Sequence, residues 1–582
     1  MYGQQADTLK RQLQIMTSED IVLSERKPQL LQLSAPRPSK ASRIQLVAEP
    51  LQSRMPALSL DPLTTLVAPA PYYNRSGQRG YLELAGGLRY NAYLAAGLRA
   101  IDRKDTQLDI FTSGLYSNYR LNSYDLERQA REQRLSLGVD YSSTLTSGVK
   151  LALAGGIKHN KYNYYGYLPD QSSFTPEELS SVIAKPELQR NTFHATLSLG
   201  PSKASGGLNY YFNPSIAYSQ VAGLGGWEQK RSANELHLGI DGKLSYGLDK
   251  LGDVVVDVSA NSYTYNNSAT RLAGTAGHTY SNKSLLRLSP YWHYERSQQD
   301  VDWGLKLGLG IDMYNEHEFK GGLITPRAEA YLNFDRNWQV NLSATGGVRA
   351  NSLTQMLDEM PYLRIMRNAH ATRIPLDLKL ALRGLLNPAV ELNAELQYMK
   401  YKGAVNYLAI GTYSPVPTDM YINVPIEPIN HQAGFTPEQA DGSVVRLSAG
   451  ATAQLSPYVR LAGQATYNHW SQTNSVTPEP TLYGRPKFLL NAELTYRPNQ
   501  NVELTGGYSL RSGIQQRVAT KMNITMLKMA DLSQLNLSVA YHINKAWTLN
   551  GAMHFVQNAK AEVYYGYTAQ RFSAVLDIHY RF

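Results

Sequence analysis

Acidic and basic side chains fall on the same alternating face in several extended segments. The acidic ones are Asp302, Asp312, Asp377, Glu391 and Glu395, and basic ones on the same parity include Lys306, Lys379 and Arg383. Carboxylates are among the groups that enzymes use for acid–base catalysis. Because these charges share one face of each segment, we interpret them as water-facing residues that pair with one another. No nucleophile with an adjacent base accompanies them, so we predict that the chain is not an enzyme.

Two other groups invite a site interpretation. Glu316 and Glu318 flank His317, but in a strand the imidazole would point away from both carboxylates. A metal site would also need a further ligand. Gly308 and Gly310 lie in an extended segment with no following helix, which a nucleotide-binding fingerprint requires. We therefore predict no metal and no cofactor.

The segments that carry these charges alternate apolar with polar residues. The apolar members are Trp303, Leu305, Leu307, Leu309, Ile311 and Met313 in one segment, and Ile374, Leu376, Leu378, Leu380 and Leu382 in another. The same alternation runs through 390–399 and 534–543. Segments of about ten residues with this pattern are typical of transmembrane β-strands, apolar toward lipid and polar toward the lumen. No apolar run approaches the ~18 residues that a membrane helix needs.

The last segment, 571–582, places Phe572, Ala574, Leu576, Ile578, Tyr580 and Phe582 on one parity. It resembles the terminal strand of bacterial outer-membrane barrels, where a C-terminal Phe in an aromatic strand marks the chain for insertion. We therefore predict a barrel-insertion signal made of Phe572, Leu576, Ile578, Tyr580 and Phe582.

Ten short turns alternate with long polar loops between residues 80 and 582. The turns are expected at 102–104, 146–147, 200–204, 248–251, 298–300, 335–337, 386–388, 456–457, 498–500 and 544–545. The main loops are expected at 158–190, 265–282, 351–372, 403–442 and 511–531. This asymmetry, with long loops facing out, is typical of outer-membrane barrels. We predict an all-β, antiparallel transmembrane barrel of about 22 strands, with 18 or 20 as alternatives.

Residues 1–79 lack this alternation of apolar and polar residues. Prolines recur at Pro28, Pro36, Pro38, Pro50, Pro56, Pro62, Pro69 and Pro71, and each removes a backbone donor and disfavours helix before it. We expect an extended arm that is periplasmic or threads the lumen. Its opening has no apolar signal-peptide core. We therefore expect a mature chain or a start assigned within the signal.

Composition fits an envelope protein. The 582 residues carry a net charge of +10, no cysteine and 41 tyrosines against 11 phenylalanines. Tyrosine suits membrane interfaces and wet loops, and the absence of cysteine suits an oxidising compartment. The basic residues are dispersed, which disfavours nucleic acid as a partner. We predict the outer membrane of a Gram-negative bacterium, with its lipid as one partner.

Two loops are candidates for partner contact. One holds Met356, Leu357, Met360, Tyr362, Leu363, Ile365 and Met366. Such an apolar cluster is either folded into the barrel mouth or buried by another chain. The other loop, 162–167, is tyrosine-rich. It suits glycan stacking or an interface, or it is an ordinary surface loop.

The C-terminal third carries a more specific similarity. Gly484-Arg485-Pro486, 529–532, 564–567 and the final strand resemble the barrel end of TonB-dependent receptors, particularly plug-poor receptor-like proteins of Bacteroidota. Asn351-Ser352-Leu353 followed by Pro361-Tyr362-Leu363 resembles a loop of that group. The chain departs from the family before residue 80, where no glycine-rich plug motifs occur.

The resemblance implies a barrel, and the departure bears on function. We predict an accessory or scaffold subunit of a multi-protein envelope complex, acting in outer-membrane protein assembly or surface export. Its protein partners would lie in the outer membrane or periplasm. The alternative is a TonB-dependent-receptor-like transporter or porin-like channel for solute uptake.

Overall fold

The computed structural model describes residues 79–88, 91–123, 126–166, 187–201, 207–223, 232–267, 280–298, 301–316, 319–334, 337–363, 369–410, 434–472, 483–519, 524–558 and 560–582. Within them the chain is almost entirely β-structure. No helix in this part of the chain is long and apolar enough to cross a membrane. The expected arm lies outside the described residues, apart from Arg79.

The wall of the barrel is built from strands joined to their neighbours along the chain. The first eleven are β1 (Gly80–Gly87), β2 (Asn91–Arg103), β3 (Thr106–Ser123), β4 (Leu126–Thr144), β5 (Val149–Asn163), β6 (Glu187–Pro201), β7 (Leu208–Ala222), β8 (Ser232–Gly247), β9 (Asp253–Asn267), β10 (Lys283–Gln298) and β11 (Val301–Glu316). The others are β12 (Lys320–Phe334), β13 (Trp338–Arg349), β14 (Thr372–Asn387), β15 (Val390–Ile410), β16 (Gly434–Ser456), β17 (Val459–Gln472), β18 (Phe488–Tyr496), β19 (Val502–Ser512), β22 (Leu532–His542), β23 (Trp547–Val556) and β26 (Phe572–Arg581).

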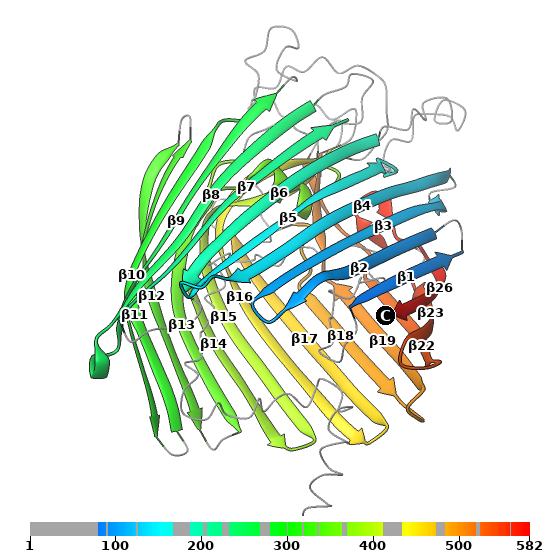
Figure 1. Cartoon of the computed structure of the whole chain (residues 1–582). Helices are drawn as coiled ribbons and strands as arrows, with labels where there is room; N and C mark the ends of the chain where they lie inside the picture. The colour runs from blue at the N-terminus through cyan, green and yellow to red at the C-terminus, as the bar shows by residue number, and fades with distance from the viewer. Residues whose placement is uncertain are drawn as a thin grey trace, which may run out of the picture. The chain divides into compact units, whose positions relative to one another are not determined.

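The sheet closes where β26 pairs antiparallel with β1, in a register that places Ile578 opposite Leu84. Figure 1 shows these two strands, red and blue, side by side. The carbonyl oxygen of Phe582 accepts hydrogen bonds from the backbone N–H groups of Arg79 and Gly80, at 2.6 and 2.9 Å. The result is a closed antiparallel barrel of 22 strands, which confirms the predicted fold and strand number.

Smaller elements lie between the wall strands. They are η2 (Asp249–Leu251), α3 (Leu353–Glu359), the hairpin β20 (Gln515–Ala519) and β21 (Ile524–Lys528), and the pair β24 (Glu562–Tyr564) and β25 (Tyr567–Thr568). Strand β20 also pairs in parallel with the end of β15, where Val518 lies opposite Ala409. All these elements except η2 interrupt long loops, so they gather on the side opposite the short turns.

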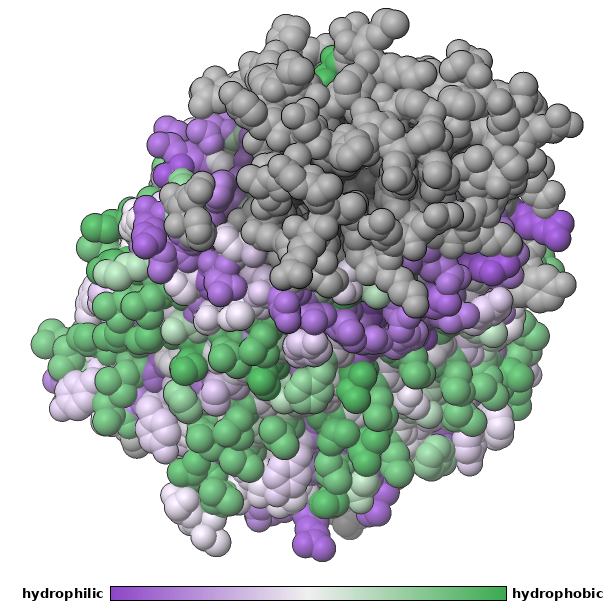
Figure 2. Space-filling model, turned by 90° about the horizontal axis from the view of Figure 1, so that it is seen from above, coloured by the Kyte–Doolittle hydropathy of each residue, from purple (hydrophilic) through white to green (hydrophobic). Residues whose placement is uncertain are grey.

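Side chains alternate between lipid and lumen as predicted. On β11, Leu307, Leu309 and Met313 are exposed, whereas Lys306 and Asp312 on the other parity are buried. Figure 2 shows hydrophobic side chains over a broad area of the outer surface, bordered by a hydrophilic band. A closed barrel with an apolar exterior satisfies every backbone hydrogen bond in lipid, so the strands span a membrane.

One predicted lipid-facing residue points inward. Ile374 is only 4% exposed and packs with Met399, Tyr401 and Trp470. A register shift between Arg373 and Leu376 adds one residue to β14 relative to β15. Such a bulge transfers every following side chain to the other face. The prediction that the alternation runs unbroken through Ile374 was therefore wrong.

The strand ends flank all ten predicted turns, but several strands run further into the expected loops. Strand β15 continues to Ile410 and β16 begins at Gly434, so both extend well into the loop expected at 403–442. The extended ends of β15 and β16 pair with each other beyond the lipid-facing belt. Their sequence there lacks the alternation that lipid imposes, so it did not predict strands.

Candidate functional site: the barrel mouth

Helix α3 forms inside the loop between β13 and β14. Ser352 caps it: the Ser352 hydroxyl accepts from the backbone N–H of Gln355, and the Gln355 side chain accepts from the backbone N–H of Ser352. This capping box stabilises the first turn. Leu353, Met356 and Leu357 then fall on one face and are all buried. The helix therefore presents an apolar stripe to the rest of the mouth.

The predicted contact loop packs within the chain. Met356, Leu357, Met360 and Leu363 are each 3% exposed or less, and Tyr362 packs against the same apolar group. We call this group the mouth cluster; its aromatic members are Tyr119, Tyr162, Tyr164, Tyr165, Tyr265, Tyr280, Tyr362, Tyr407, Phe435, Tyr564, Tyr565 and Tyr567. Ile365 and Met366 lie outside the described residues.

Tyr362 occupies the centre of the mouth cluster. Its ring stacks on Tyr567, with centroids 3.7 Å apart and planes 18° apart. Tyr165, which follows β5, meets the edge of Tyr567 at 5.0 Å, and Phe435 of β16 lies 6.2 Å from the same ring. Strands β5 and β16 are eleven strands apart in a ring of 22, so they stand on opposite walls of the barrel. Aromatic contacts therefore cross the whole mouth.

Polar contacts fix the loop that carries α3. The Tyr162 hydroxyl donates to the Pro361 carbonyl at 2.6 Å, and Tyr164 donates to the Leu363 carbonyl at 3.1 Å. The Arg190 guanidinium donates to Asp358 at 2.6 Å. Contacts of this kind come from the β5 and β6 wall, so the loop is held down by side chains across the barrel from β16.

The base of this loop is clasped by a buried lysine. Lys283 is 2% exposed, and its ammonium donates to the carbonyls of Ala350 and Asn351, both at 3.1 Å, and to the carbonyl of Ala369. Its charge is matched by Glu316 at 3.4 Å. Because Ala350 and Ala369 stand on the two stems of the loop, one ammonium ties both stems together.

A repeated motif links two of the loops. Tyr-Tyr-Gly-Tyr occurs at 164–167 and again at 564–567. A Cβ at Gly166 would overlap the Tyr567 ring, so glycine permits this contact. Tyr164 and Tyr165 are buried at 3% and 9% exposure, so the surface-loop interpretation was wrong for them, and Tyr167 lies outside the described residues. The repeat was a sequence signal that could have paired these loops.

Burial in the mouth cluster changes the titration of its phenols. Loss of water around Tyr165 raises the pKa of its hydroxyl to about 12, although hydrogen bonds to Tyr119 and Tyr362 oppose the shift. Burial likewise holds the pKa of Tyr362 well above its ordinary value. Both hydroxyls are therefore neutral donors at physiological pH.

Below the mouth, the lumen wall carries ion pairs. Lys306 meets Glu329 at 2.7 Å, Arg383 meets Glu391 at 2.6 Å and Lys379 lies 3.8 Å from Asp377. Asp312 pairs with Arg287 at 2.5 Å. These contacts confirm the predicted pairing for Asp312, Asp377 and Glu391, whereas Asp302 accepts a hydrogen bond from the Ser297 hydroxyl.

The remaining predicted site residues are placed as follows. Among the described residues no group of three acidic, histidine or cysteine side chains is arranged to hold a metal, and His317 and Glu318 lie outside them. Phe572, Leu576 and Ile578 are exposed on the lipid side of β26, and Phe582, which directly follows the strand, is also exposed. Tyr580 stacks between Trp547 at 4.4 Å and Phe582 at 5.6 Å. Their role as an insertion signal stays a prediction.

Comparison with known proteins adds the fold class. No family model matches the sequence, and no curated protein matches it. Among solved structures, the FrpB iron transporter of Neisseria meningitidis is similar, with 10% identity, a TM-score of 0.62, and coverage of 87% of this chain and 81% of that one. The ferric enterobactin receptor of Pseudomonas aeruginosa in complex with enterobactin has 12% identity, a TM-score of 0.63 and the same coverage. The pyoverdine outer membrane receptor FpvA of Pseudomonas aeruginosa, bound to pyoverdine, has 10% identity, a TM-score of 0.61, and coverage of 87% and 78%. This chain thus has the fold of outer-membrane receptor barrels, and its lipid-facing strands place it in the outer membrane.

Proposed function

We propose that the chain is a receptor-like barrel that takes up a solute through a gated lumen. The observation that carries the proposal is the mouth cluster, in which aromatic contacts connect opposite walls above an ion-paired lumen. A barrel of about this size encloses a lumen that must be closed at rest. A cluster held by side-chain contacts, rather than by the wall itself, is suited to open and close.

The similar structures support the uptake role over the scaffold role. Their names describe an iron transporter and receptors for ferric enterobactin and pyoverdine. We propose a solute of the same class, an iron chelate, taken up with energy from a periplasmic partner of the TonB type. The accessory-subunit role predicted from the sequence has less support, because the fold comparisons favour its alternative.

The test is chelate binding and uptake. Purified barrel in detergent would be titrated with a panel of ferric chelates while intrinsic tryptophan fluorescence is recorded. Cells lacking other iron-chelate receptors would then be assayed for uptake of the chelate that binds. We expect saturable binding and uptake that depends on this chain. Failure to bind any chelate, together with stoichiometric copurification of other outer-membrane proteins, would instead support the scaffold role.

The domain division belongs to the same proposal. We propose that residues 1–79 act with the barrel of residues 80–582 as a segment that contacts its lumen, its rim or a partner. Its prolines lower the entropy lost on ordering, because φ is already fixed.

A further inference from the structure

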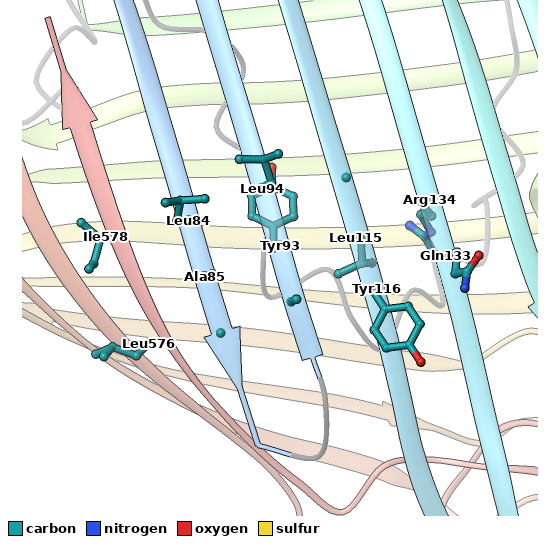
Figure 3. Close-up of a pocket in the computed structure, with 13 residues that line it drawn as sticks. Leu84, Ala85, Tyr93, Leu94, Leu115, Tyr116, Gln133, Arg134, Leu576 and Ile578 are labelled. Atoms are coloured by element: carbon teal, nitrogen blue, oxygen red, sulfur yellow. The ribbon is translucent and has the colours of Figure 1, made fainter.

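The outer surface carries a groove where the barrel closes. It has a volume of about 730 Å³ and is flanked by Leu84, Leu94, Tyr116, Leu576 and Ile578 from four neighbouring strands (Figure 3). All five side chains are exposed, with fractions between 39% and 56%. They belong to the lipid-facing parity of β1, β2, β3 and β26. The groove is therefore open to the acyl chains of the membrane.

Small residues make the groove deep. Gly86, Ala92 and Gly114 line it between the larger side chains. A Cβ placed at Gly86 has no heavy atom within 4 Å, and one at Gly114 makes only ordinary contacts. The hollow therefore results from missing side chains on the outward parity, and a larger residue at Gly86 would fill it without strain.

Polar residues stand at the edge of the groove that is nearer to the long loops. Strand β3 runs toward the long-loop side, and its ladder with β4 pairs Tyr116 with Gln133 and then Asn118 with Arg131. Two residues along a strand correspond to about 7 Å. On β4 the exposed Leu135 and Leu137 share the parity of Arg131, with no register shift between them. Arg131 and Asn118 therefore lie on the lipid side, one step beyond the groove, where headgroups replace acyl chains.

The charge of Arg131 is not matched within the described part of the protein. Its Nη2 donates to the neutral amide of Gln129 at 2.7 Å, and its buried Nε has no hydrogen-bond partner among the described residues. Among the described side chains no carboxylate pairs with it. On the neighbouring strand, by contrast, Lys161 pairs with Glu187 at 2.7 Å. Beside Arg131, the Asn118 amide donates a long hydrogen bond of 3.5 Å to the Tyr116 hydroxyl. A half-buried guanidinium next to side-chain amides is a good partner for phosphate.

We propose that this face binds a lipid of the outer leaflet whose headgroup carries a phosphate and a net negative charge. One acyl chain fills the groove over β26, β1, β2 and β3, and the phosphate meets Arg131 together with the amides of Asn118 and Gln133. The position within the lipid-facing belt excludes a water-borne solute as the occupant, and the unmatched positive charge selects an anionic headgroup. This inference does not depend on the proposed uptake function.

Native mass spectrometry of the full-length barrel tests the proposal. The protein in detergent is titrated with phosphatidylglycerol or phosphatidylcholine of identical acyl chains, and the fraction that retains one lipid is measured. We expect the wild type to retain the anionic lipid at a roughly tenfold lower concentration, as a charge-assisted contact would give. Arg131→Gln should remove this preference.

Two further variants separate the headgroup from the chain. Lys400→Gln removes an exposed, outward-parity charge on β15, away from the groove, and should leave the preference unchanged. Gly86→Leu should weaken retention of both lipids, because it fills the groove. Heat-modifiable electrophoretic mobility confirms that each variant is folded. Equal retention of both lipids by the wild type would overturn the proposal, and so would equal effects of Arg131→Gln and Lys400→Gln. It would also be overturned if the groove were occupied by a membrane protein that copurifies with the wild type and is lost in Gly86→Leu.

Discussion

Tyr362 stacks face to face on Tyr567, although the two residues are carried by different loops that leave different walls of the barrel. Tyr164 and Tyr564 meet Tyr362 at its edge, at 5.9 and 5.6 Å. One side chain thus organises contacts from three loops. The mouth cluster should therefore respond strongly to the loss of this ring and weakly to the loss of its hydroxyl.

Replacing Tyr362 tests that expectation. Tyr362→Ala removes a ring from a packed cluster, which should destabilise the closed mouth by about 3 kcal/mol. Amide hydrogen exchange in 353–363 should accelerate accordingly, and the outer membrane should admit a large antibiotic. Tyr362→Phe keeps the stacking and loses the hydrogen bond to Tyr165, so it should destabilise the mouth by only about 1 kcal/mol. If the alanine variant exchanges and excludes antibiotic normally, the cluster does not close the lumen.

Raising the pH should loosen the same cluster. The pKa of Tyr165 lies near 12, against an ordinary value of 10.0, because the buried phenol resists ionisation. Its contribution to stability is therefore complete below pH 10 and is lost as the pH rises through about 12. Tyrosinate absorbance should show one late-titrating phenol fewer in Tyr165→Phe than in the wild type, while Tyr362 still titrates late. A single titration at the ordinary pKa in both proteins would contradict this assignment.

The sequence predicted the wall better than the mouth, for a physical reason. Lipid imposes a period of two on every spanning strand, so the positions of Leu307 and Leu309 followed from pattern alone. The register shift at Ile374 adds one residue to β14 and breaks the alternation, and Pro375 within it was the local sign, since proline in a sheet occurs at edges and bulges. At the mouth, Tyr162 contacts Pro361 from 199 positions away, a pairing that no local signal specifies. The capping box at Ser352 was the one local clue to α3.

The lipid face of β22 should reject charge. Leu537 is 49% exposed on the outward parity, and an Arg there should cost about 2–4 kcal/mol near the bilayer midplane. Leu537→Arg should therefore lower the yield of folded, heat-modifiable barrel. Ser538→Arg, on the lumen side of the same strand, is the matched control and should insert normally. Equal tolerance at both positions would contradict the orientation of the strand.

The backbone and the ring of Phe582 should have separate effects on barrel closure and on insertion. The Phe582 carbonyl closes the barrel onto Arg79 and Gly80, while the ring stacks on Tyr580. Phe582→Ser, combined with Tyr580→Ser, removes the aromatic signal but keeps the closing hydrogen bonds, whereas deletion of Phe582 removes both. We expect reduced insertion and increased periplasmic degradation in both variants. Wild-type surface levels of the double serine variant would show that the rings are not a recognition signal.

The segment before the barrel should contribute to closing the lumen or to binding a partner protein. Deleting residues 5–75 removes no residue of the mouth cluster, so a new leak would be assigned to the loss of that segment. We expect either sensitivity to large antibiotics or loss of protein partners after mild solubilisation, because a lumen of about 22 strands needs material to fill it. Combining the deletion with Tyr362→Ala tests whether the segment and the mouth cluster close the lumen independently. If they do, the combined variant should leak more than either single variant. If the truncated protein inserts, keeps its partners and causes no leak, the mouth cluster alone closes the lumen and residues 5–75 are dispensable for it.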